Sequence, residues 1–454
     1  MALAAARTRV ARAALTGRYD LFLGVGAGLA ILGAILTARA LLGEHDLAER
    51  AWHVWHVNWV YFTGLAGAHV AFTAVHKIVN AKWSGLVIRF TQATLYFLPV
   101  VLVTFLVTWV FGYEAIWGHM HEELHGLSPG KAWWLSKPVM FTRVFGFLCL
   151  LYLVGWRLVR ADLLPDVHEL KGQATGSRKA LFEKFTAGWG SPETMARTQR
   201  TIYRLAPVYV VLYAITYTFV AFDTMMALQP HWFSNLFGGW YFMASFLSAH
   251  MSLALLMIYG GRQLGIADLI SAKQRHDLGK LCFGFSVFWA YLMWAQFQVI
   301  WYANMPEETG FVYSRVYGDW WVLSRVVLVG MFVVPFFGLL GVAPKKNRFT
   351  LGLFAGVSLV ALWLCWYLMV MPSVSKSAGP VFGLPELGPT LLFPGLFLAC
   401  YALFARRWPM VSPRLAEITL EREIHHHEVE TFDHEDDDRD FVHERDLSPG
   451  RGPA

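Results

Sequence analysis

The sequence predicts an all-α, polytopic membrane protein with about ten transmembrane helices, arranged as two four-helix bundles plus two flanking helices. Of its 454 residues, 56% are hydrophobic and only 15% are charged, and the mean hydropathy is +0.43. This composition is too apolar for an ordinary soluble protein. Long uncharged runs also recur along the chain, each near the roughly 20 residues that a helix needs to cross hydrocarbon. A third observation, the return of motifs from the first half in the second half, divides the helices into two sets.

The expected spans alternate in direction, and the basic residues orient them. The spans are about 21–42, 54–76, 86–111, 139–159, 205–228, 237–260, 281–303, 320–341, 350–371 and 390–405. Lys and Arg gather in every second loop, whereas the other loops are poor in basic residues. By the positive-inside rule, both termini are expected to be cytoplasmic.

The predicted organisation has six parts. These are a cytoplasmic N-terminal lead (1–20), a flanking helix (21–53), a first four-helix bundle (54–228) with a cytoplasmic loop (160–204), a second four-helix bundle (237–371), a flanking helix (390–405) and an acidic tail (408–454). The lead is rich in Arg and has no apolar segment of the kind found in signal peptides. The tail contains three consecutive histidines at 425–427, and its excess of acidic residues predicts a largely disordered segment.

Two pairs of residues indicate an internal repeat. His69 and His250 stand 181 residues apart, and in each half a tryptophan of an aromatic cluster precedes the histidine by ten residues. Arg143 and Arg325, each within an [ST]-R-V sequence, stand 182 residues apart. We therefore expect spans two to five and spans six to nine to be two copies of one unit in the same orientation.

The span around His69 is unusual because polar residues interrupt an otherwise apolar helix. Asn58, His69 and His76 fall within about 40° of one another on a helix of 3.6 residues per turn. Ionisable groups at bilayer depth are costly and tend to be functional, and a histidine titrates near neutral pH. The sequence thus predicts a polar face that carries protons.

Further polar residues extend this proposed proton path. In span five, Tyr209, Thr216 and Asp223 are spaced by seven and share a face, and in span seven Lys280, Tyr291 and Gln298 share another. The candidate proton path comprises His69, Asp223, His250, Tyr209, Thr216, Lys280, Tyr291 and Gln298. Arg143 or Arg325 is the expected ion-pair partner of Asp223, since pairing lowers the cost of burying the carboxylate.

Structural alternatives stay open for these residues. His69 and His250 could serve only as hydrogen-bonding contacts between helices, or together ligate a b-type haem. Arg143 and Arg325 could be interface anchors, and Lys280 could be an ordinary basic residue that reaches the membrane surface. The four cysteines are scattered in apolar runs, so no disulfide framework, iron–sulfur or haem-attachment spacing is present. The sequence predicts no catalytic residue, no metal ligand set and no cofactor bound by this chain.

Three segments resemble a known family. They are Asn58-Trp59-x-Tyr61-Phe62 leading to Ala68-His69, the run 222–226 (FDTMM), and the stretch from 276–280 (HDLGK) to 301–309 (WYANMPEET). Over about 20–405 the chain resembles the NrfD, or polysulfide-reductase-type, integral membrane subunits. The likeness is greatest to the F subunits of bacterial alternative complex III, a quinol:electron-acceptor oxidoreductase.

The resemblance implies two four-helix bundles with flanking helices, and partners within a respiratory complex. Those partners are a paralogous NrfD-like C subunit, an iron–sulfur subunit and a multihaem cytochrome c subunit, so haem c and Fe–S centres lie on other chains. It implies proton half-channels and a role in assembly for this chain.

Other functions remain open at this stage. The first alternative is a quinol site in this chain, for menaquinol or another quinol, formed by His53, His56 and Asn58. His53 and His56 could instead face lipid headgroups. A proton-coupled secondary transporter is a further alternative, and a purely structural anchor is the last.

Overall fold

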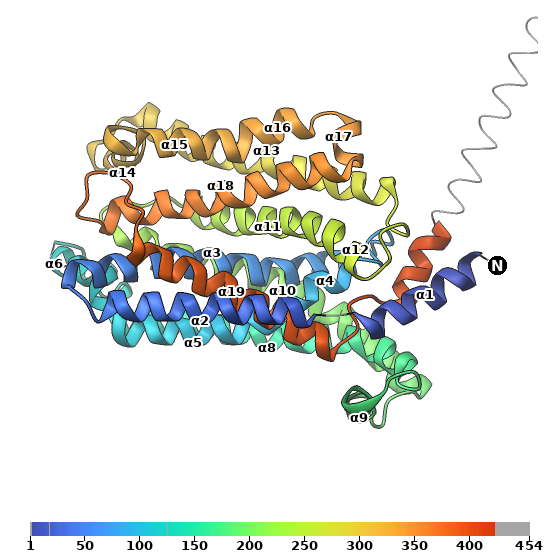
Figure 1. The fold of residues 1–454 in the computed structure, drawn as a ribbon. Coiled ribbons are helices and arrows are strands. Elements are labelled where there is room, and N and C mark those ends of the chain that lie inside the picture. The colour runs from blue at the N-terminus through green and yellow to red at the C-terminus, as the bar shows by residue number, and fades with distance from the viewer. Residues whose placement is uncertain (1, 18, 125, 423–454) are drawn as a thin grey trace, which may run out of the picture.

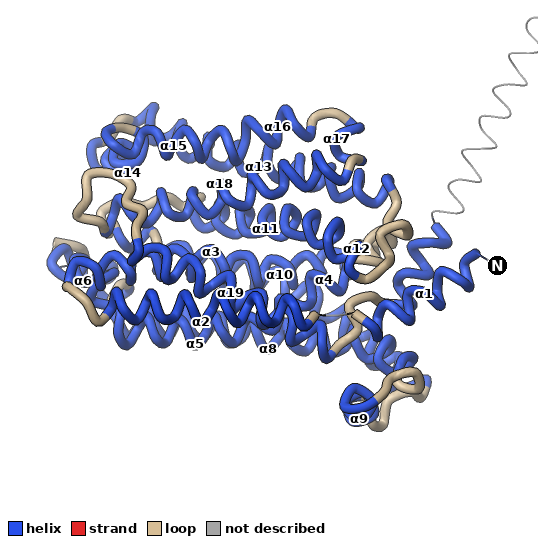
Figure 2. Tube along the Cα trace, viewed as in Figure 1, coloured by secondary structure: helices blue, strands red, loops and turns tan. Residues whose placement is uncertain are grey.

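The computed structural model describes residues 2–17, 19–124 and 126–422. All regular secondary structure in these residues is helical, as Figure 2 shows. The long helices run side by side along a common direction, while α1 and α9 project beyond one end (Figure 1). We call that end the α1 end and the opposite end, where α6 and α14 lie, the α6 end. The described part of the chain therefore has the elongated, parallel helix packing expected of a membrane bundle.

The helices of the first half include one 3-10 segment, η1, and one π-helical turn, η2. In order they are α1 (Ala2–Thr16), α2 (Asp20–Leu41), α3 (His45–Ile78), α4 (Ile88–Gln92), η1 (Ala93–Phe97), α5 (Leu98–Val107), η2 (Thr108–Gly112), α6 (Tyr113–Leu124), α7 (Pro129–Trp134), α8 (Lys137–Leu170), α9 (Gly176–Phe185) and α10 (Pro192–Thr224). The segments from α4 to α6 follow one another without a loop and form a single long rod.

The second half begins with a short 3-10 turn and ends at the last flanking helix. In order the elements are η3 (Met226–Leu228), α11 (Phe237–Leu255), η4 (Leu256–Gly260), α12 (Gly261–Gln263), α13 (Ala272–Ala303), α14 (Pro306–Val316), η5 (Gly318–Trp320), α15 (Trp321–Leu328), η6 (Val329–Val333), α16 (Val334–Leu339), α17 (Val342–Lys346), α18 (Arg348–Val374) and α19 (Leu384–Arg407). Asn304 closes α13 in the left-handed conformation, and Pro306 begins α14.

Nine helical segments in the described ranges are long enough and apolar enough to cross a membrane. The predicted span 54–76 lies within α3, which has 34 residues but is not among the nine. Every residue of α3 from Ala51 to Ala74 is buried. Because α3 is enclosed by other helices, it can carry polar side chains without exposing them to lipid, and its composition is correspondingly less apolar.

Helix α3 lies at the junction of the two sets of helices. It packs against α10 and the α4–α6 rod, and also against α11, α18 and α19. Helices α8 and α10 pack along each other, as do α11 and α13, and α18 packs against both α11 and α15. The contacts therefore connect both halves of the chain through α3 and α11.

The flanking helices α2 and α19 pack closely together through glycines (Figure 1). A β-carbon added at Gly26 would lie 2.7 Å from the amide nitrogen of Ala399, and one at Gly388 would lie 2.6 Å from that of Thr37. Such contacts are too short for any side chain, so only glycine permits this approach of the two backbones. Small residues at the contact are typical of helix pairs in membranes.

Three segments expected to lie outside regular structure are partly helical. The lead contains α1, and the loop 160–204 consists of the end of α8, α9 and the start of α10, because charged turns extend the apolar spans. The tail is the clearer correction. Residues 413–422 are helical, and the side chains of Trp408, Met410 and Val411 are buried, since the tail begins with apolar residues that cover the α1 end. The histidines at 425–427 lie outside the described residues.

Candidate functional site

Five buried histidines follow α3 from one end to the other, four on α3 and one on the adjacent α11. Each ring donates a hydrogen bond to a backbone carbonyl. The bonds run from His53 Nε2 to Ala115 (2.9 Å), from His56 Nε2 to Thr224 (2.7 Å), from His69 Nδ1 to Leu65 (2.9 Å), from His76 Nδ1 to Phe72 (2.9 Å) and from His250 Nδ1 to Phe246 (2.7 Å). Because a carbonyl can only accept, each bonded nitrogen carries the proton. In the neutral ring, the second nitrogen is then the one able to receive a proton.

His69 has a hydrogen-bond partner at this second nitrogen. The hydroxyl of Ser252 on α11 lies 2.9 Å from His69 Nε2 and 2.7 Å from the carbonyl of Ser248. When His69 is neutral, the single hydroxyl proton of Ser252 can point to Nε2. When His69 is protonated, Nε2 can donate to Ser252, whose proton then turns to Ser248. His69 can therefore gain or lose a proton without losing a hydrogen bond.

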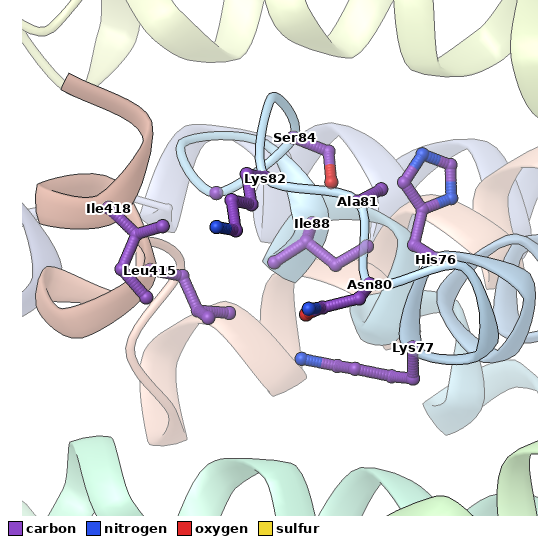
Figure 3. A pocket seen from close by; sticks show the side chains of 10 residues that line it. His76, Lys77, Asn80, Ala81, Lys82, Ser84, Ile88, Leu415 and Ile418 are labelled. Atoms are coloured by element: carbon purple, nitrogen blue, oxygen red, sulfur yellow. The ribbon is translucent and has the colours of Figure 1, made fainter. Parts of the chain in front are cut away.

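At the α1 end, a small cavity reaches the last histidine of α3. It has a volume of about 80 Å³ and is lined by His76, Lys77, Asn80, Lys82 and Ser84 among others. Figure 3 shows His76 on the side opposite Leu415 and Ile418. The cavity is large enough to hold water. His76 Nε2 is buried and has no protein partner among the described residues, so water in this cavity would be its natural partner.

Three tyrosines bind the backbone of α3 in its middle section. Each hydroxyl donates to a different carbonyl of that helix. The pairs are Tyr209 with Gly67 (3.1 Å), Tyr241 with Val60 (2.8 Å) and Tyr217 with Thr63. A β-carbon at Gly67 would lie too close to the hydroxyl oxygen of Tyr217, and this explains why α3 has a glycine there. These hydroxyls are engaged in structural bonds, so proton transfer through them would require those bonds to break.

Near the α6 end, Asp223 forms a buried ion pair with Arg143. Nε and one terminal nitrogen of Arg143 each lie 2.7 Å from a carboxylate oxygen of Asp223, whose residue is 0% exposed. The guanidinium also lies 3.8 Å above the ring of Trp134. Of the two arginines considered as partners, Arg143 forms the pair. Arg325 is exposed and binds backbone carbonyls.

The two predicted polar faces lie in different environments. Tyr209, Thr216 and Asp223 share a buried face of α10, and the hydroxyl of Thr216 has no hydrogen-bond partner among the residues described. Lys280, Tyr291 and Gln298 lie on the outer surface of α13, where Lys280 pairs with Asp277 at 2.8 Å. The structure therefore brings the α10 residues close to α3 but leaves the α13 residues facing outward.

The three residues of the predicted quinol site divide between two faces of α3. His53 and His56 face α6 and the end of α10, where they bind the carbonyls of Ala115 and Thr224. Asn58 faces the other way. Its carbonyl oxygen accepts a hydrogen bond from Trp363 of α18 at 3.0 Å, and its amide nitrogen lies 3.4 Å from the Thr390 hydroxyl of α19.

A buried ion cluster at the α1 end was not predicted. Arg89 of the α4–α6 rod is 0% exposed and binds the carboxylates of Asp162 (3.0 Å) and Asp166 of α8. Lys77 of α3 adds a 2.7 Å ion pair to Asp162. The sequence alone would assign Lys77 and Arg89 to the positive-inside loops. The available signal was the pair of carboxylates four residues apart, which share a face at the end of α8.

These features define an integral, multi-pass, all-helical membrane protein whose central helix carries buried titratable groups. No protein-family model and no curated protein matches this chain.

Proposed function

We propose that this chain is the proton-conducting integral membrane subunit of a respiratory quinol:electron-acceptor oxidoreductase of the alternative complex III type. It would lie in the bacterial inner membrane with both termini in the cytoplasm. One observation carries the proposal: histidines recur along a helix that is buried without interruption from Ala51 to Ala74, each with one nitrogen bonded to backbone and the other able to take up a proton. Such groups are costly to bury unless they serve a purpose.

The cavity at the α1 end supports an entry route for protons. His76 lines this cavity, and the rings of His76 and His250 both pack against Phe72, with centroid distances of 3.9 and 5.1 Å to it. His69 lies seven residues, or about two helical turns, before His76 on α3, and it binds Ser252 on the helix of His250. Transfer between the rings would use intervening water or ring rotation. The proposed half-channel thus runs from the α1 end toward the middle of the bundle.

The chain would depend on partner subunits for its electrons. In this proposal, haem c and iron–sulfur centres on neighbouring subunits oxidise quinol, and this chain transfers the accompanying protons and braces the assembly. The ion pair between Asp223 and Arg143 would bind α8 and α10 together near the α6 end and thereby hold His56 and the carbonyl of Thr224 in place.

A second candidate function is quinol binding by this chain. Nδ1 of His53 and Nδ1 of His56 are both buried without a hydrogen-bond partner in the described structure, so either could accept a proton from a quinol hydroxyl. Asn58, on the opposite face, would not contribute to the same pocket. A photoreactive quinone analogue added to the purified complex should label residues near His53 and His56 if this candidate is correct. Label found only on another subunit would exclude it.

The composition of the native assembly tests the main proposal. The full-length chain, tagged and purified from its own membranes in mild detergent, should carry partner subunits with the absorbance of c-type haem and the paramagnetic signals of iron–sulfur centres. The assembly should also reduce an added acceptor when quinol is supplied. An intact chain that purifies alone, or with partners that contain neither centre, would contradict the proposal.

A further inference from the structure

The second set of helices encloses a cavity of about 440 Å³ near the α6 end, and none of the residues of the proposed proton path lines it. It lies among α11, α13, α14, α15 and α18, and its walls are almost entirely apolar and aromatic. Its size falls within the range of sites that hold small organic ligands. The cavity is therefore large enough to bind a ligand or part of one.

Four residues that line this cavity each have a buried nitrogen–hydrogen group with no hydrogen-bond acceptor among the described residues. They are Nε1 of Trp232, Trp240 and Trp289, and Nε of Arg315. Each of these residues is at most 5% exposed. An unsatisfied buried donor costs about 1–3 kcal/mol, and such groups are rare in native proteins. Four donors around one cavity indicate a ligand that supplies acceptor oxygens.

Arg315 also brings an uncompensated positive charge to the cavity. Its guanidinium donates to the carbonyls of Phe311 and Met369 and to the hydroxyls of Ser314 and Ser373, and it lies 3.4 Å above the ring of Phe311. All of these partners are neutral. No carboxylate lies within ion-pair distance of Arg315 in the part of the chain that the structure describes. Burial lowers the pKa of Arg315 to about 9, which still leaves it charged at neutral pH. A buried cation of this kind requires an anion.

An arginine in the first set of helices differs from Arg315 because it has an anionic partner within the chain. There, Arg143 finds an internal carboxylate in Asp223. In the second set, the neighbouring α18 has no acidic residue along its whole length, from Arg348 to Val374. The chain thus supplies the counter-ion in one half and leaves it to be supplied from outside in the other.

The cavity opens sideways, toward the lipid-facing surface of the bundle. Trp294 of α13 and Leu328 of α15 line it and are 54% and 39% exposed. Arg325, which is exposed, lines it as well. A ligand can therefore enter from the bilayer, and its apolar chain can extend out of the cavity between α13 and α15.

We propose that this cavity binds an anionic amphiphile, a carboxylate or phosphate head group on an aliphatic chain. The head group accepts hydrogen bonds from Arg315 and from the indoles of Trp232, Trp240 and Trp289. The aliphatic chain of the ligand lies along the apolar wall and extends out of the cavity past Leu328. This site is independent of the proposed proton path and of the identity of the partner subunits.

Quenching of tryptophan fluorescence by brominated ligands tests the proposal directly, because tryptophans line the cavity. Purified full-length protein in non-ionic detergent is titrated with dibromostearate and, separately, with its uncharged methyl ester. We expect saturable quenching by the acid and at least about tenfold weaker binding of the ester, the factor that loss of a charged hydrogen bond gives. Arg315→Gln should weaken the binding of the acid by a similar factor. The matched control Arg262→Gln, which changes an exposed arginine at the α1 end, should leave this binding unchanged.

A second variant and two further ligands test the proposal even if Arg315→Gln fails to fold. Leu328→Phe narrows the mouth of the cavity without changing the buried donors, so it should also weaken the binding of the acid. Dibrominated phosphatidylglycerol, compared with dibromostearate, shows whether the natural head group is a phosphate or a carboxylate. Equal quenching by acid and ester in the wild-type protein would overturn the proposal. The proposal would also be overturned if a neutral brominated quinone displaced the acid and bound equally well to the wild type and to Arg315→Gln.

Discussion

The hydroxyl of Ser252 lies 2.9 Å from Nε2 of His69, which joins the central helix α3 to α11 in the middle of the bundle. Ser252 follows His250 by two residues, so His69 contacts the same turn of α11 that carries the second histidine of the sequence repeat. The serine can donate to the neutral ring or accept from the protonated one, since it has a second acceptor in the carbonyl of Ser248. A proton relay requires a group that can both donate to and accept from the histidine in this way, whereas a purely structural contact does not require it.

Removing this hydroxyl should slow proton transfer with little effect on folding. We expect Ser252→Ala to lower the rate of proton-coupled quinol oxidation in the intact complex by about tenfold, because the protonated ring loses a hydrogen bond worth about 1–1.5 kcal/mol. Stopped-flow detection of proton uptake measures this rate. The matched control is Ser286→Ala on α13, a buried serine that binds its own helix at 2.9 Å and should be silent. Equal rates for both variants would contradict the relay.

The ion pair between Asp223 and Arg143 should dominate the stability of the α8 and α10 pair. Asp223→Asn leaves the side chain of Arg143, only 9% exposed, without its anion, and breaking a buried pair costs about 3–5 kcal/mol. Thermal unfolding of the purified protein should show this loss, and the double variant with Arg143→Gln should recover part of it. Arg325→Gln, at an exposed position, should change stability by no more than about 0.5 kcal/mol. A stable Asp223→Asn protein would show that the pair contributes little.

The glycines between α2 and α19 provide a second, independent test of the packing. A β-carbon at Gly33 would collide with the backbone of Leu392, whereas one at Gly28 would meet nothing within 4 Å. Gly33→Ala should therefore destabilise the protein by about 1–3 kcal/mol. Gly28→Ala should be neutral or slightly stabilising, since alanine favours the helix. If both variants unfold at the same temperature, α2 and α19 do not pack as described.

The start of the acidic tail should contribute to stability, in contrast to the expectation from composition. A chain that ends at Arg407 loses the buried side chains of Trp408, Met410 and Val411, each worth about 1.5–3 kcal/mol, or about 4.5–9 kcal/mol in total. A chain that ends at Arg422 keeps them and serves as the control. Limited proteolysis and thermal unfolding should separate the two truncated proteins. Indistinguishable stability would mean that residues 408–422 are not part of the folded core.

The sequence was sufficient to predict the helical membrane fold and to single out α3. Hydropathy finds a span by its apolar run, and the polar residues Asn58 and His69 marked this helix as different from the rest. The spacing on α10 likewise indicated a buried face, which the structure places against α3 and α8. Periodicity cannot say which face of a helix turns inward, however. It grouped Lys280 with Tyr291 on α13, and that face lies on the outside.

Partners far apart in the sequence were the least accessible to prediction. Arg89 and its carboxylates at Asp162 and Asp166 are separated by more than 70 residues, and basic residues near a span end are usually assigned to its cytoplasmic loop. The unsatisfied donors around Arg315 come from four separate elements and become visible only when the helices are assembled.

Proton uptake per quinol oxidised, measured in liposomes that contain the intact complex, is the most direct test of proton conduction by the histidines along α3. We expect His69→Asn and His250→Ala to lower this ratio or its rate, while assembly and the oxidised-minus-reduced haem spectrum stay unchanged. Exposed His231, replaced by Gln, is the matched control and should behave as the wild type. If both α3–α11 histidine variants assemble fully and take up protons at the wild-type rate and ratio, the histidines along α3 do not conduct protons.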